Sequence, residues 1–118
     1  MKAITSVPSN RARELLGDII ENIDRITNYT TGMAFDDWVG NQMVVDAVER
    51  CLQRITEASI NLAKIDENLL PDQDWKRMRG FGNRLRHGYN DLDPTIVWNT
   101  VTDYLPPLRD ACDQARGV

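Results

Sequence analysis

The chain has 118 residues, 42% of them hydrophobic and 27% charged, with a formal net charge of −4 at neutral pH. This composition is typical of a globular protein, and the length allows one domain over residues 1–118 and excludes two. A folded chain of this size buries roughly two-thirds of its unfolded surface, so it can build a core without metals or disulfides. We therefore expect Cys51 and Cys112 to be free thiols that pack as small apolar residues.

The sequence also indicates where the protein resides. No apolar run approaches the roughly 18 residues of a membrane span, and the first ten residues lack the long apolar stretch of a signal peptide. Two cysteines do not form the disulfide framework of a small secreted protein. We expect a cytoplasmic protein that does not insert into a membrane.

Two helices are predicted in the first half of the chain. Apolar residues recur every three or four positions and predict a helix over residues 9–30, with Ser9 or Asn10 as its N-cap. A second stripe with the same spacing predicts one continuous helix over residues 35–65. The polar, proline-containing segment 66–74 is typical of a connecting loop.

A third helix is predicted over residues 74–87. Its apolar stripe consists of the large side chains Trp75, Met78, Phe81 and Leu85. Gly80 and Gly82 each cost about 1 kcal/mol relative to alanine in a helix interior. We therefore expect another part of the backbone, or a second copy, to approach the helix closely at both glycines.

The last predicted helix is capped by Asp93, has Pro94 at its first position and continues toward Ala115. Pro106 and Pro107 lack backbone N–H groups and should kink or break it. Four amphipathic helices joined by short loops can bury their stripes only against one another. The sequence thus predicts an all-α antiparallel bundle of four helices, or five if the prolines divide the last one.

Charge is unevenly distributed along this acidic chain. Residues 75–90, here called the basic segment, contain His87, five of the 14 basic residues and none of the 18 acidic ones. The other 102 residues hold the remaining nine basic residues and all of the acidic ones. Such a run is often only a solvated helix face. Because unneutralised like charges on a short segment cost stability, an anionic partner is the alternative.

The sequence offers no evident site for a metal or a cofactor. Di-metal centres in helical bundles use Glu-x-x-His pairs on two helices, whereas His87 is the only histidine and has no glutamate three residues before it. The string from Gly80 to Gly82 lacks the lysine and hydroxyl residue that end a phosphate-binding loop. We expect no metal and no cofactor, which leaves the basic segment as the candidate site.

Residues 83–89 read Asn-Arg-Leu-Arg-His-Gly-Tyr and combine groups that suit a phosphodiester. An imidazole can accept or donate a proton near neutral pH, and arginines bind phosphate through paired N–H donors. Tyr89 adds a hydroxyl or a ring that can stack on a base. A structural interpretation stays open, in which His87 is a cation at the helix C-terminus and Tyr89 packs in the following loop.

The segment from Trp75 to Tyr89 resembles the signature helix of the HepT-like proteins in the HEPN superfamily, whose pattern is Trp-Arg-x-x-x-x-x-Arg-Asn-x-Leu-x-His-x-Tyr. Residues 55–58 are similar to the family's Ile-(Gly/Ser)-Glu-Ala string, and the resemblance extends to residues 96–98 and 105–108. It implies a HEPN-like bundle that forms a homodimer with paired His-x-Tyr segments at a shared cleft.

The resemblance also implies a function, namely the toxin of a toxin–antitoxin pair. Such a toxin is a metal-independent endoribonuclease, and its partner is a minimal nucleotidyltransferase antitoxin that attaches AMP to the motif tyrosine. Matched position by position, His87 corresponds to the catalytic histidine, Asn83 to the motif asparagine and Tyr89 to the modified tyrosine. RNA is the implied substrate.

One motif position differs from the family. Gly82 stands where the family has an arginine that binds phosphate. The resemblance leaves that role to Arg79, Arg84 or Arg86. We assign Arg84 to the catalytic group with His87 and Asn83, and we expect Lys76, Arg79 and Arg86 to bind RNA phosphates.

Two functions therefore remain open. In the first, His87 takes the proton of an RNA 2′-hydroxyl while arginines stabilise the charge that develops on the phosphate. In the second, a non-catalytic dimeric module docks nucleic acid or a nucleotidyltransferase on its basic face, and His87 is structural. A small nucleotidyltransferase encoded beside this chain would favour the first.

Overall fold

The computed structural model describes residues 7–70, 72–87 and 92–117, and the regular elements among them are all helical. In chain order they are α1 (Asn10–Tyr29), α2 (Phe35–Val39), α3 (Gln42–Ile65), α4 (Trp75–His87), α5 (Pro94–Asn99), the π-helix η2 (Thr100–Tyr104) and α6 (Leu105–Arg116). The predicted all-α bundle is confirmed. Tyr89, the expected modification site, lies outside the described residues.

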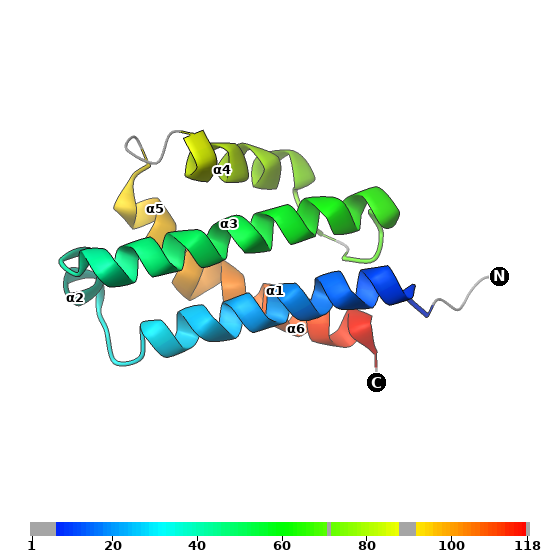
Figure 1. The fold of residues 1–118 in the computed structure, drawn as a ribbon, viewed down its shortest axis with the longest axis horizontal. Helices are drawn as coiled ribbons and strands as arrows, with labels where there is room; N and C mark the ends of the chain where they lie inside the picture. The colour runs from blue at the N-terminus through cyan, green and yellow to red at the C-terminus, as the bar shows by residue number, and fades with distance from the viewer. Residues whose placement is uncertain (1–6, 71, 88–91, 118) are drawn as a thin grey trace.

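The helices are arranged around α1 and α3, which run antiparallel and side by side (Figure 1). Helix α6 packs on α1, and the run from α5 through η2 to α6 crosses behind the pair. Helix α4 packs along α3 at the margin of the bundle. This position leaves α4 with one face on α3 and the other open to solvent.

Aliphatic side chains from α1, α3 and α6 form the centre of the core. All of them are at most 3% exposed: Leu15, Leu16, Ile19, Ile23, Ile26, Leu52, Ile55, Leu62, Leu105 and Leu108. Cys51 and Cys112 are free and buried, as expected. Burial raises the pKa of the Cys112 thiol to about 12. Both cysteines therefore act as core residues.

Polar side chains start the helices much as the sequence indicates. Ser9 Oγ accepts a hydrogen bond from the Ala12 N–H at 3.1 Å and caps α1. Asp93 accepts from the Thr95 N–H at 2.9 Å and caps α5, with Pro94 at its first position. These bonds satisfy N–H groups that have no partner within the helix.

The expected continuous helix over residues 35–65 is wrong, because the chain turns at Gly40 and Asn41 between α2 and α3. Asn41 has extended backbone angles, and its side chain accepts from the Val44 N–H at 3.2 Å, which starts a new helix. Helix α2 then presents the fully buried Trp38 to Trp98, with ring centroids 5.2 Å apart. The apolar spacing continued through the turn, so periodicity alone did not reveal it.

The helix disruption expected at Pro106 and Pro107 occurs just before them. In η2 the hydrogen bonds change register, and the Leu105 N–H donates to the Thr100 carbonyl, five residues back. Both prolines then fall in the first turn of α6, where a missing N–H costs little. The last predicted helix thus becomes α5, η2 and α6.

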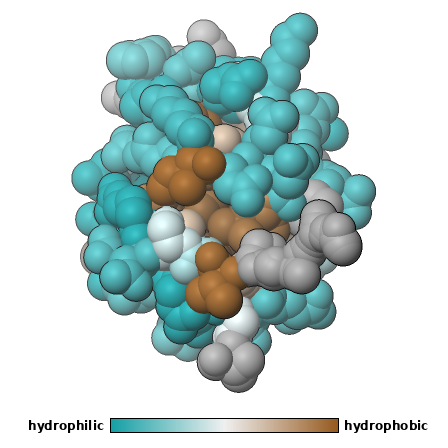
Figure 2. Space-filling view, turned by 90° about the vertical axis from the view of Figure 1, so that its right-hand side faces the viewer, coloured by the Kyte–Doolittle hydropathy of each residue, from teal (hydrophilic) through white to brown (hydrophobic). Residues whose placement is uncertain are grey.

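The surface at the end of the molecule that holds both termini has apolar residues at its centre, surrounded by polar ones (Figure 2). Val7, before α1, is 84% exposed, and Ile65, at the end of α3, is 45% exposed. This surface is at the opposite end from the C-terminus of α4. Within the described residues, no helix is both long and apolar enough to cross a membrane.

Candidate functional site

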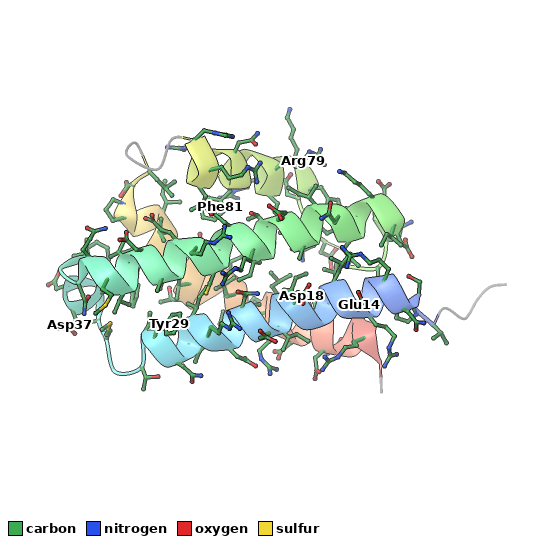
Figure 3. All side chains as sticks on the ribbon, in the orientation of Figure 1. Glu14, Asp18, Tyr29, Asp37, Arg79 and Phe81 are labelled. Carbon is green, nitrogen blue, oxygen red and sulfur yellow. The ribbon has the colours of Figure 1, made fainter. Side chains whose placement is uncertain are left out.

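Helix α4 has two distinct faces. Met78, Gly82 and Leu85 are buried, and Trp75 and Phe81 pack partly buried against the core. Figure 3 shows Phe81 between α4 and α3. This inner face is the apolar stripe that the sequence predicts, with Gly82 added to it.

The outer face carries the predicted site residues that the structure describes. All six are exposed: Lys76, Arg79, Asn83, Arg84, Arg86 and His87. Asn83 and Arg84 precede His87 by four and three residues, so both are its neighbours one turn away. At about 100° per residue, Arg86 and Arg84 lie about 160° apart around the axis, on opposite flanks of this face. The structure thus brings Asn83 and His87 together and separates the two arginines.

The C-terminal end of α4 is held by α3. Gln53 Nε2 donates to the Leu85 carbonyl at 2.9 Å, and Arg50 Nη1 donates to Gln53 Oε1 at 3.0 Å. These bonds satisfy one of the last carbonyls of α4 and fix the turn that carries His87. The sequence analysis did not single out Gln53, because nothing in the local pattern of a polar residue on α3 indicates a partner in another helix.

The two glycines of α4 differ in their surroundings. A Cβ added at Gly82 would lie 2.9 Å from Thr56 Oγ1 and 3.2 Å from Thr56 Cβ, so this position requires glycine. A Cβ at Gly80 would meet nothing within 4 Å. The expected close approach is therefore confirmed at Gly82, where α3 is the neighbour. At Gly80 no part of the described chain supplies it.

Arg86 is the only predicted phosphate ligand with a printed side-chain partner on the same helix. Its Nη2 donates to Asn83 Oδ1 at 2.6 Å. Its Nη1 lies 3.6 Å from the point that a Cβ on Gly82 would occupy. The guanidinium thus folds back over the groove that Gly82 leaves and lies beside Asn83.

The electrostatics of α4 favour an anion. The helix contains no acidic residue. Lys76, Arg77 and Arg79 form no ion pair with a carboxylate among the residues that the structure describes. In the same part of the chain, no group of three or more histidine, cysteine, aspartate or glutamate side chains could hold a metal ion. The donor set therefore suits a phosphate better than a cation.

A groove between α1 and α3 provides a contrast. Its charged lining residues are balanced in sign: Arg11, Arg25 and Arg54 face Asp18, Glu21 and Glu57. A polyanion would meet as many carboxylates as guanidinium groups there. The outer face of α4 is the better candidate for a nucleic-acid interface.

Comparisons with known proteins agree with this location. A family profile described as "Ribonuclease HepT-like" matches residues 19–115, which include the whole of α4. A protein of Thermococcus cleftensis named "Probable ribonuclease HepT" is 31% identical over 104 residues, covering 88% of this chain and 94% of the relative.

Two proteins of Methanocaldococcus jannaschii, each named a "Putative RNase", are also similar. One is 33% identical over 100 residues, covering 85% of this chain and 83% of the relative. The other is 30% identical over 103 residues, covering 87% and 85%. The comparison with solved structures found no match.

Proposed function

We propose that this chain, which belongs to the HepT-like ribonuclease family of the HEPN superfamily, is a metal-independent endoribonuclease that binds RNA across the outer face of α4. The supporting observation is the arrangement of that face. His87 ends an exposed helix that has no acidic residue, with Asn83 and Arg84 one turn below it. A polyanion attracted to this face would place its phosphates beside an imidazole.

The proposed reaction uses the RNA's own 2′-hydroxyl. His87 accepts its proton, the 2′-oxygen bonds to phosphorus, and the bond from phosphorus to the 5′-oxygen breaks. Arg84 and Arg86 stabilise the charge on the phosphate oxygens, and Lys76 and Arg79 bind flanking phosphates. The departing 5′-oxygen needs a proton, which a second His87 in a homodimer would supply.

The homodimer is supported by Gly80. This exposed glycine costs helix stability and contacts no described part of its own chain, so a second copy can approach α4 there. Light scattering at micromolar concentration should give twice the chain mass of 13.5 kDa. A mass of 13.5 kDa would contradict the dimer.

The central test of the proposed function is His87→Ala. Because general acid–base catalysis contributes about 10² to 10⁴-fold, we expect RNA cleavage to fall by that factor. EDTA should leave cleavage by the parent unchanged. Gln114→Ala, an exposed substitution on α6, is the matched control and should cleave like the parent. Undiminished cleavage by His87→Ala would exclude the enzymatic function.

The second function, a non-catalytic binding module, is favoured by Gly82, which stands where the motif has an arginine. It predicts that the parent binds RNA and does not cleave it. Cleavage that depends on His87 would exclude this alternative.

We further propose a nucleotidyltransferase antitoxin as partner, with Tyr89 as the residue that receives AMP. The added phosphodiester would pair with the cations that RNA phosphate needs and so inhibit cleavage. Intact-mass spectrometry after co-expression with a nucleotidyltransferase encoded nearby should show an adenylyl adduct. The adduct should be absent from Tyr89→Phe, and its persistence there would move the modification elsewhere.

A further inference from the structure

We infer that Arg86 is the guanidinium that holds the scissile phosphate in this chain, and that Asn83 positions it. The inference rests on the proposed function and deepens it. The geometry that carries it is a juxtaposition of three residues on α4: Arg86 Nη2 lies 2.6 Å from Asn83 Oδ1, and Arg86 Nη1 lies 3.6 Å from the Cβ point of Gly82.

Position 82 cannot itself supply the phosphate ligand. The Cβ point of Gly82 is 2.9 Å from Thr56 Oγ1, and real Cβ atoms are not found so close to a neighbour. Thr56 is not free to move away, because its hydroxyl donates to the Gln53 carbonyl at 2.9 Å and the residue is 3% exposed. An arginine at position 82 would therefore push α4 away from α3. The space beside Gly82 is instead occupied by the guanidinium of Arg86.

Asn83 orients this guanidinium without using up its donors. An arginine has five N–H groups, and the bond to Asn83 engages one of them. Within the described part of the chain, Arg86 forms no ion pair with a carboxylate. Two parallel N–H donors, which bidentate phosphate binding requires, remain on Arg86. Asn83 is four residues before His87, so the pair lies one turn from the imidazole.

The other arginines of α4 fit this role less well. Arg84 is on the opposite flank of the helix, about 160° from Arg86 around the axis. Arg79 is two turns below His87, and no described side chain orients its guanidinium. Arg77 is on the flank of Arg84 and serves as a matched control, since it is an exposed arginine of the same helix.

The test compares Arg86→Gln with Arg77→Gln, which remove the same charge. Binding is measured by fluorescence anisotropy with a short 2′-O-methyl RNA, which cannot be cleaved because its 2′-oxygen carries no proton. We expect Arg86→Gln to raise Kd about tenfold and to reduce the slope of log K against log salt by about 1. Arg77→Gln should raise Kd less than about threefold.

A second readout separates positioning from mere helix structure. Arg86→Lys should recover little of the binding, because an ammonium does not replace the paired donors. Asn83→Ala should weaken binding in the parent and have no further effect in an Arg86→Gln background. With cleavable RNA, kcat/KM should fall about 10²-fold or more in Arg86→Gln.

The outcomes are distinguishable. If Arg86→Gln and Arg77→Gln have equal effects on both Kd and kcat/KM, the inference is overturned. If the parent binds RNA through Arg86 and does not cleave it, the ribonuclease function fails and the inference stands. If the parent neither binds nor cleaves RNA, both are overturned.

Discussion

Helices α1 and α4 both pack on α3, yet their charges are arranged in opposite ways. On α1 the charges have partners within the chain: Arg25 lies 2.7 Å from Glu21, and Asp24 pairs with Arg109 of α6. Helix α4 has five basic residues and no acid. The charges of α1 serve the fold, whereas those of α4 weaken it and are explained by a ligand outside the chain. Three predictions test this difference.

The largest effect is expected at Gly82, where α4 contacts α3. Gly82→Ala should lower the free energy of unfolding by about 1–2 kcal/mol, since overpacking against Thr56 exceeds the gain in helix propensity. Chemical denaturation measures it. In a Thr56→Ala background the nearest clash is removed, so the cost should shrink by about 1 kcal/mol. An equal cost in both backgrounds would exclude Thr56 as the cause.

An intermediate effect is expected at Asp24 on α1. Arg109 Nε and Nη2 donate to its two carboxylate oxygens at 2.7 and 3.0 Å, and this bonding lowers the pKa of Asp24. Because the side chains are 48% and 39% exposed, Asp24→Asn should cost only about 0.5–1 kcal/mol at pH 7.

The pH dependence of that cost has a definite sign. A carboxyl whose pKa is lowered by folding stabilises the fold above its ordinary pKa of 3.8, and the contribution disappears as the pH falls through the lowered value. Unfolding measured from pH 7 down to pH 3 should therefore show the parent and Asp24→Asn converging below about pH 4. Glu14→Gln, which removes an exposed pair, is the control. A gap that stays constant with pH would contradict the ion-pair explanation.

The smallest effect is expected at Gly80 on the outer face of α4. Gly80→Ala enters open space and should stabilise the monomeric fold by about 0.5–1 kcal/mol through helix propensity alone. If a second copy approaches there, the same change should weaken dimerisation in a dilution series followed by light scattering. Stabilisation with an unchanged dimer would place the interface elsewhere.

Most of the fold could be predicted from the sequence because its signals are local. Spacing of apolar residues identified α1 and α4, and capping residues such as Ser9 and Asp93 identified their neighbourhoods or starts. The break at Gly40 and Asn41 was missed because Trp38 and Val48 keep the apolar spacing on both sides of it. The direction of α2 depends on its contact with Trp98, which lies far away in the sequence.

The candidate site was predictable in its residue types and not in its contacts. His87, Asn83 and the arginines could be named from the basic segment and the motif. That Gly82 faces Thr56, and that Gln53 holds the end of α4, depends on the register between α3 and α4. Neither side of that contact carries a local signal, because a threonine or a glutamine on a helix has many possible neighbours.

The π-helix before α6 has a consequence for how this chain tolerates insertions and deletions. Each residue in an α-helix turns the chain by about 100°, so one extra residue would rotate everything after it by that angle. A π turn holds one residue more than an α turn and thereby absorbs such an insertion. In η2 this lets Leu105, Leu108 and Cys112 stay in phase with the core while Val97 is buried before them. Removing one residue from 100–104 would therefore rotate α6 and turn these side chains away from α1.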